Sequence, residues 1–126
     1  MNSPFSEISQ ALSLYFDGLY ASDTKKLSRI FHPRAIYACA TEGKLLHLTM
    51  DEYFPIVDKR PSPASRGEAR TDRIVSIELA GPVTAFAHLR CSIGPKHFTD
   101  FLTLVLVDGR WQIISKVFHY DLKEAV

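Results

Sequence analysis

The sequence predicts an α+β fold in which N-terminal helices pack against one face of an antiparallel sheet. Apolar residues recur at steps of three and four over residues 4–31, which is typical of amphipathic helices. Four alternating segments joined by short turns follow after residue 70, as expected for a meander of strands. The 126 residues, 46% of them apolar, suffice for one core, and we assign residues 1–126 to a single domain.

Two helices are predicted at the start of the chain. Ser3 can cap free backbone N–H groups and Pro4 suits a first helical turn, so the first helix should cover residues 4–21. Ser22-Asp23 then caps a second, shorter helix. It should stop before Pro33, because the residue preceding a proline disfavours the helical conformation.

Two short strands and a third helix are expected next. Residues 35–40 and 45–48 are rich in strand-forming side chains, and Gly43 marks the turn between them. Thr49 and Glu52 have the spacing of a capping box, which predicts a helix beginning immediately after Thr49.

Residues 58–70 are predicted to form a mobile surface loop. They contain two prolines, a glycine and no large apolar side chain. The simplest interpretation of their three arginines and one lysine is that water solvates them, and a phosphate-binding lid is the less favoured alternative.

The second half of the chain is predicted to be all strand, and Asp108-Gly109 is a strong hairpin turn. On the strand over residues 98–107 both faces are apolar, although helices can cover only one of them. We therefore expect a homodimer that forms through the sheet. The predicted strands cover residues 73–79, 83–93, 98–107 and 111–120.

Asp100 is the most conspicuous polar residue, because aspartate is depleted in strands and is rarely buried alone. In an apolar pocket, burial would favour its neutral carboxyl, which can act as a general acid or donate a hydrogen bond. The alternative is an edge aspartate paired with a nearby lysine or tyrosine. On simple alternation, His119 shares a face with Trp111, Ile113 and Val117. It could pair with Asp100 there, or be a core histidine bonded to a backbone carbonyl.

Other residues add weaker indications of a pocket. The Tyr15 hydroxyl could reach into a cavity, whereas His32 more simply makes a turn contact. Cys39 and Cys91 are interpreted as small buried thiols in a reducing compartment. The residues that we expect to line the pocket are Tyr15, His32, Tyr37, Cys39, Tyr53, Asp100, Trp111 and His119.

Several function classes are disfavoured. Fifteen basic and fourteen acidic residues nearly cancel, which argues against nucleic-acid binding. The N-terminus does not resemble a signal peptide and no apolar stretch is long enough to span a bilayer, so we expect a cytoplasmic protein without membrane association. The histidines lack metal-ligand spacing, and phosphate-loop and dinucleotide motifs are absent. We therefore predict no metal and no cofactor.

The segment from Leu27 to Ala35 and the tail from Phe98 to His119 resemble the nuclear transport factor 2-like superfamily, also described as SnoaL-like. Within it the chain is most similar to the branch labelled putative lumazine-binding. The resemblance implies a cystatin-like conical barrel, usually dimeric, whose curved sheet wraps around the N-terminal helices and a pocket. Members include ketosteroid isomerase, cyclases, dehydratases and binding domains, so fold does not determine function.

Comparison with ketosteroid isomerase implies that Tyr15 and Asp100 correspond to its oxyanion hole, while Cys39 falls where it keeps its general base. Steroid isomerisation is therefore not expected. We favour a binding domain for a small apolar or aromatic molecule that carries a carbonyl or hydroxyl. The alternatives are a cyclase, isomerase or dehydratase that uses Asp100 and His119 as acid and base, and a dimerisation module without a ligand.

Overall fold

The computed structural model describes residues 3–123. Helix α1 (Pro4–Ala21) begins as predicted, because the Ser3 hydroxyl accepts a hydrogen bond from the Ser6 backbone N–H. Helix α2 (Thr24–Ile30) is capped by the carboxylate of Asp23. The predicted capping box at the start of α3 is also present. Local capping chemistry therefore sets where each helix begins.

The remaining elements follow the predicted order, with four of the six strands longer than expected. Strand β1 starts immediately after α2 rather than at residue 35, and the Asp108-Gly109 turn has both residues at positive φ, as the hairpin requires. The elements after α2 are β1 (Phe31–Cys39), β2 (Leu46–Thr49), α3 (Met50–Lys59), the 3-10 turn η1 (Ala64–Arg66), β3 (Arg73–Ala80), β4 (Thr84–Ile93), β5 (Lys96–Val107) and β6 (Arg110–Leu122).

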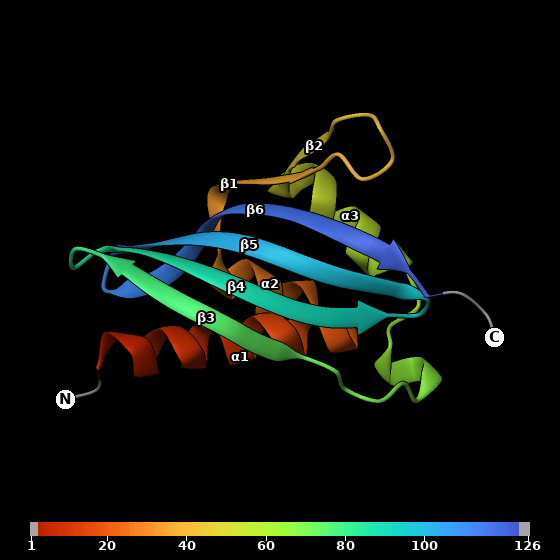
Figure 1. Ribbon diagram of the computed structural model, residues 1–126, viewed down its shortest axis with the longest axis horizontal. Helices are drawn as coiled ribbons and strands as arrows, with labels where there is room; N and C mark the ends of the chain where they lie inside the picture. Colours follow the sequence, from red (N-terminus) through yellow and green to blue (C-terminus); the bar gives the residue numbers. More distant parts are fainter. Residues whose placement is uncertain (1–2, 124–126) are drawn as a thin grey trace.

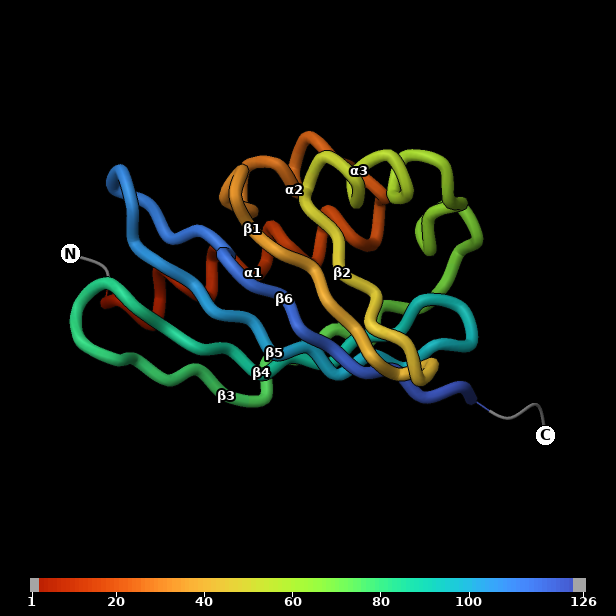
Figure 2. The backbone as a smooth tube through the Cα atoms, turned by 90° about the horizontal axis from the view of Figure 1, so that it is seen from above, coloured from red at the N-terminus to blue at the C-terminus, as the bar shows by residue number. Residues whose placement is uncertain are grey.

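The strands form one curved sheet with the order β2-β1-β6-β5-β4-β3. The helices lie on one side of this sheet, and the outward faces of β3 to β6 are uncovered by any helix (Figure 1). Seen from above, β1 and β2 lie on the same side as α3, so the sheet curls towards the helices (Figure 2). The α+β class is confirmed, with one difference: β1 and β6 pair in parallel, while the other pairings are antiparallel.

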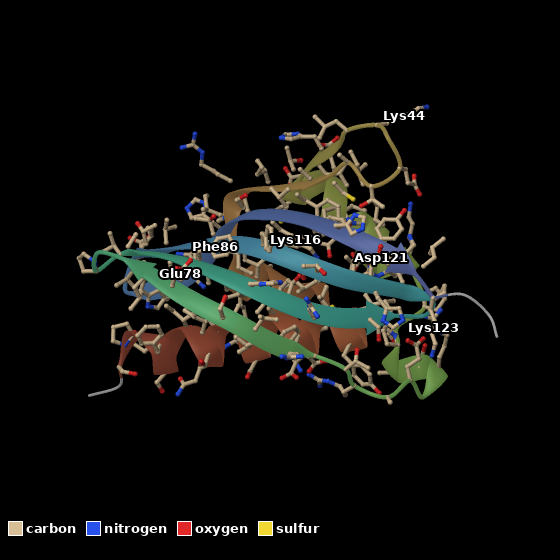
Figure 3. The ribbon with its side chains drawn as sticks, viewed as in Figure 1. Lys44, Glu78, Phe86, Lys116, Asp121 and Lys123 are labelled. Carbon is tan, nitrogen blue, oxygen red and sulfur yellow. The ribbon has the colours of Figure 1, made fainter. Side chains whose placement is uncertain are left out.

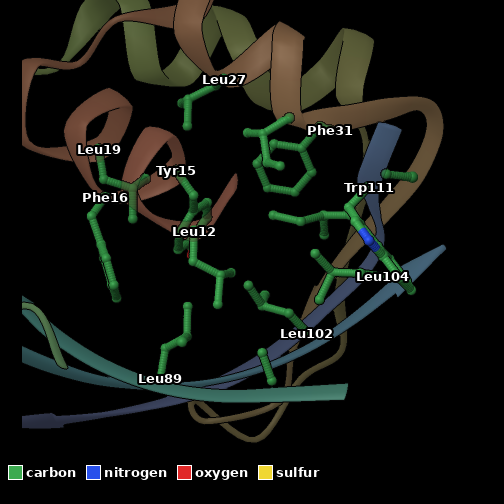
Figure 4. Close-up of a cluster of buried hydrophobic side chains, with 14 of the residues drawn as sticks. Leu12, Tyr15, Phe16, Leu19, Leu27, Phe31, Leu89, Leu102, Leu104 and Trp111 are labelled. Carbon is green, nitrogen blue, oxygen red and sulfur yellow. The ribbon is translucent and has the colours of Figure 1, made fainter. Parts of the chain in front are cut away.

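The core fills the space between the helices and the inner face of the sheet. Leu12 and Tyr15 of α1 point towards Leu89 and Leu102 of the sheet (Figure 4). These side chains are fully buried, so their apolar area holds the helices against the sheet.

A β-bulge in β6 changes which side chains face the helices. Leu104 pairs with Ile113 and Thr103 with Ser115, so Ile114 is an extra residue in β6. The alternation reverses at this point. Trp111 and Ile113 are buried before the bulge, and Lys116 and Phe118 are buried after it.

The segment over residues 58–70, expected to be a mobile loop, is anchored at several points. The Tyr20 hydroxyl donates to the Glu68 carbonyl at 2.6 Å, and the Glu68 carboxylate accepts from the Gly94 N–H at 2.8 Å. Arg70 forms salt bridges with Asp17 and Asp72. These contacts hold the segment against α1 and the β4–β5 turn.

Candidate functional site

A buried polar cluster lies at the centre of the inner face of the sheet. Asp100 on β5 is fully buried, and the Tyr15 hydroxyl donates a hydrogen bond to its Oδ2 at 2.5 Å. The ammonium of Lys116, on the adjacent strand β6, is 4.0 Å from the same oxygen. Within residues 3–123, Asp100 Oδ1 has no hydrogen-bond partner. One carboxylate oxygen therefore remains free to accept a further hydrogen bond.

The Lys116 ammonium is surrounded by aromatic rings. It lies 5.2 Å from the ring centre of Tyr15, 5.3 Å from that of Tyr37 and 5.0 Å from that of Phe118. Tyr37 also stacks on Tyr53 with ring centres 4.2 Å apart. Cation–π attraction and the Asp100 carboxylate together compensate a charge that burial would otherwise disfavour.

Burial and charge shift the titration of this cluster. Burial, and then the charge of Asp100, raise the pKa of Tyr15 well above its usual value. Burial raises the pKa of Tyr37 to about 12, although Lys116 acts in the opposite direction. Burial, the largest single effect, would lower the pKa of Lys116, but the charges of Asp100 and of the neighbouring Tyr53, Tyr37 and Cys91 together outweigh it, and the net shift is upwards. Lys116 is thus a fixed cation, not a neutral amine nucleophile, at neutral pH.

A cavity of about 680 Å³ lies next to this cluster, at the end of the sheet that carries the β4–β5 turn. This volume suits a drug-sized molecule. Tyr37 and Phe118 line the cavity and also contact Lys116, so they form an aromatic floor between the cavity and the polar cluster. Phe98 and Tyr120 also line the cavity from the sheet, so that these four rings together form its aromatic wall. Ile56 lines the side formed by α3.

Basic side chains surround the cavity. Lys44, Arg60, Arg66 and Lys96 line it together with a single acidic residue, Glu42. Lys44 lies near the tip of the β1–β2 connection, at the same end of the molecule as Lys123 (Figure 3). Because Glu42 accepts a hydrogen bond from the Tyr120 hydroxyl at 2.5 Å, its carboxylate is already engaged.

The predicted pocket residues fall into groups. Tyr37 and Cys39 line the cavity, while Tyr15, Tyr53 and Asp100 lie behind its aromatic floor. Tyr15 and Asp100, which the resemblance to ketosteroid isomerase pairs in an oxyanion hole, do lie side by side. The Tyr15 hydroxyl donates its proton to Asp100, so it is not free to donate to a ligand.

Three predicted residues lie elsewhere. The bulge at Ile114 turns His119 to the outer face, where its side chain is 57% exposed and contacts Thr41 and Asp121 rather than Asp100. His32 accepts a hydrogen bond from the Arg34 N–H, which is a local turn contact. Trp111 packs in the core beside Leu104 (Figure 4) and does not line the cavity.

Sequence reasoning missed Lys116 and Arg60. Lys116 and Phe118 are two residues apart on β6 and therefore lie on the same face of the sheet. Recognising Phe118 as a core residue would have placed Lys116 on the inner face. The sequence predicts Arg60 to be solvated in the loop over residues 58–70, but in the structure it follows α3 directly and its Nε and Nη2 atoms are buried. The signal that could have found Arg60 is its position one helical turn after Ile56, another cavity residue.

Other site types have little support in the described part of the chain. Cys39 and Cys91 are free thiols. Residues 3–123 contain no group of three or more histidine, cysteine or acidic side chains arranged to hold a metal ion. The described helices include none that is both long and apolar enough to cross a bilayer.

Residues 3–119 match the family described as putative lumazine-binding, and the chain belongs to this family. A relative from Cladobotryum sp., named aldolase FrzH, is 28% identical over 107 residues, which cover 83% of this chain and 82% of the relative.

Solved structures support the same fold. A protein of unknown function from Shewanella baltica, described as NTF2-like, superposes with a TM-score of 0.83 at 24% identity, covering 96% of this chain and 98% of its own. A protein from Burkholderia xenovorans, described as having a cystatin-like fold, gives a TM-score of 0.71 at 14% identity, with 98% and 97% covered. At these identities the likeness confirms the cystatin-like fold and carries no function.

Proposed function

We propose that this domain binds a small aromatic molecule in the cavity beside the β4–β5 turn. The single observation that carries the proposal is the cavity of about 680 Å³, which has an aromatic wall made by Tyr37, Phe98, Phe118 and Tyr120. Flat aromatic ligands pack well against such side chains. The family description supports the same class of ligand, because lumazine is a fused aromatic heterocycle.

The two alternative functions have weaker support. An acid–base enzyme of the predicted kind needs Asp100 and His119 at one cavity, whereas these side chains lie on opposite faces of the sheet. An enzymatic function is favoured only by the relative named an aldolase, which is 28% identical to this chain. A dimerisation module without a ligand would need an interior filled by side chains, and the cavity argues against that.

Filling the cavity should abolish binding. Ile56 lines the cavity and is 50% exposed, so Ile56→Trp should place an indole in the ligand space without disturbing the core. Val83→Trp is the control, because Val83 is 49% exposed and belongs to the β3–β4 turn at the opposite end of the sheet. We expect a neutral probe, 2-naphthol, to bind the wild type and Val83→Trp equally and Ile56→Trp at least tenfold more weakly. Equal binding to all three proteins, measured by calorimetry, would count against the cavity.

We further propose that the domain forms a homodimer through the outer face of the sheet. Phe101 is 47% exposed there, and its ring lies 5.4 Å from that of Phe86 and 5.0 Å from that of His88. Exposed apolar groups gathered on one face are typical of protein interfaces.

Sedimentation equilibrium at micromolar concentration should give twice the chain mass for the wild type. Phe101→Glu should give a monomer, because two like charges would be buried at a symmetric contact. Val83→Glu, at a position of equal exposure outside the face, should remain a dimer. A monomeric wild type contradicts this proposal.

A further inference from the structure

We infer that the cavity selects an aromatic carboxylate and that Arg60 binds its anionic group. The inference rests on the proposed binding function and adds the charge class of the ligand and the residue that recognises it.

The Arg60 guanidinium carries the argument. Its Nε and Nη2 atoms are both buried, and neither has a hydrogen-bond partner among the residues that the structure describes. A buried donor without a partner costs free energy, and the cost is greatest for charged groups. Arg60 also lines the cavity, and a rotation of its side chain would turn these donors towards an anion bound there.

The stereochemistry of the two atoms favours a carboxylate. Nη2 is the guanidinium nitrogen that lies trans to Cδ. Its N–H bond and that of Nε point in the same direction along one edge of the planar group. This edge matches the two oxygens of a carboxylate, which can accept both hydrogen bonds at once. The free edge of Arg60 is therefore suited to bidentate recognition.

The other charges around the cavity are basic, apart from that of Glu42, whose Oε1 accepts a hydrogen bond from a neutral hydroxyl. Arg66 forms a salt bridge with Glu68 at 2.7 Å, and Lys96 lies 4.6 Å from the ring centre of Tyr120. Glu42 is engaged by the Tyr120 hydroxyl. No acidic side chain among the described residues is within salt-bridge distance of Arg60, so its positive charge is available to a ligand.

The strand side of the cavity accounts for the aromatic part of the ligand. Tyr37, Phe98 and Phe118 project from β1, β5 and β6, whereas Arg60 comes from the end of α3. A planar ring against the strands, carrying a carboxylate directed towards α3, would use both walls of the cavity.

A matched pair of probes tests the inference: 2-naphthoate, which is anionic at pH 7, and 2-naphthamide, a neutral analogue of almost the same shape. We expect calorimetry to show the wild type binding the carboxylate about tenfold or more tightly than the amide, as charge-assisted hydrogen bonds predict. Arg60→Gln should remove this preference, and its affinity for the amide should stay within about twofold of the wild-type affinity. Arg73→Gln is the control and should keep the preference, because Arg73 is an exposed residue of β3 that does not line the cavity.

The outcomes separate the two proposals. If both probes bind equally to the wild type, or if the preference survives in Arg60→Gln, the inference about Arg60 is overturned while the cavity proposal stands. If neither probe binds, or if Ile56→Trp leaves binding of both unchanged, the proposed function itself fails. Circular dichroism and thermal melts of each variant show whether the fold is retained.

Discussion

The free energy of unfolding should fall steeply as the pH is raised from 9 to 12. Four side chains around the polar cluster have raised pKa values in the folded protein: Cys91 and Tyr37, both raised to about 12 chiefly by burial, together with Tyr15 and Lys116. Each group keeps its proton in the folded state at a pH where the unfolded chain has released it. The unfolded state then binds fewer protons, so stability decreases with rising pH.

The pH range over which stability falls follows from the ordinary pKa values of these groups. Stability should be nearly constant from pH 7 to 9 with respect to these groups. Cys91 should begin to contribute to the loss above its ordinary value of 9.0, and Tyr37 above 10.0. Each group can contribute up to about 1.4 kcal/mol per pH unit. Because a typical domain is stable by only about 5–15 kcal/mol, the protein should unfold before pH 12.

Urea unfolding at half-unit pH steps would measure this profile. Tyr37→Phe should reduce the slope above pH 10 by up to about 1.4 kcal/mol per pH unit, because it removes one titrating group. Ile113→Val, a conservative change at a buried position on the same face, should lower the whole curve by about 0.5–1.5 kcal/mol without changing its slope. A stability that stays constant up to pH 11.5 would contradict the titration of this cluster.

Asp100→Asn should destabilise the fold by about 3–5 kcal/mol, since it leaves the buried Lys116 cation without a counter-charge. It also weakens the charge-assisted hydrogen bond from Tyr15. Lys116→Met should have a comparable effect, because it leaves the buried carboxylate without a cation. In the double variant neither charge remains, so its loss of stability should be smaller than the sum of the single losses.

The matched control is Asp121→Asn, which makes the same chemical change on β6 at a side chain that is 78% exposed. It should alter the free energy of unfolding by less than about 0.5 kcal/mol. Strictly additive losses in the double variant would show that Asp100 and Lys116 do not act as a pair, despite the 4.0 Å between Nζ and Oδ2.

Much of the fold could be predicted because its signals are local. Ser3, Asp23 and Thr49 cap their helices as the sequence indicates, since a cap needs only a short polar side chain beside the first turn. The Asp108-Gly109 turn is equally local, because it depends on residues that tolerate positive φ.

The site was harder to predict because it depends on register. The bulge at Ile114 reverses the alternation of β6, moving His119 outwards and Lys116 inwards. A single extra residue leaves no clear mark on composition or periodicity, so simple alternation fails beyond it. The parallel pairing of β1 with β6 joins segments far apart in the chain and was likewise not visible locally.

The structure divides the predicted pocket residues into two groups. Asp100, Tyr15 and Lys116 form a buried polar cluster, and an aromatic floor separates it from the cavity. We therefore propose that the residues above the floor, including Arg60, bind the ligand and that the cluster below supports the floor.

Heteronuclear NMR with 2-naphthol tests the central proposal, ligand binding in the cavity, most directly. Saturating binding should shift the resonances of Tyr37, Phe98 and Phe118, which line the cavity, and leave those of Phe86 and Phe101 on the outer face unchanged. Shifts confined to the outer face, or no saturable shifts at all, would contradict a ligand-binding cavity in this domain.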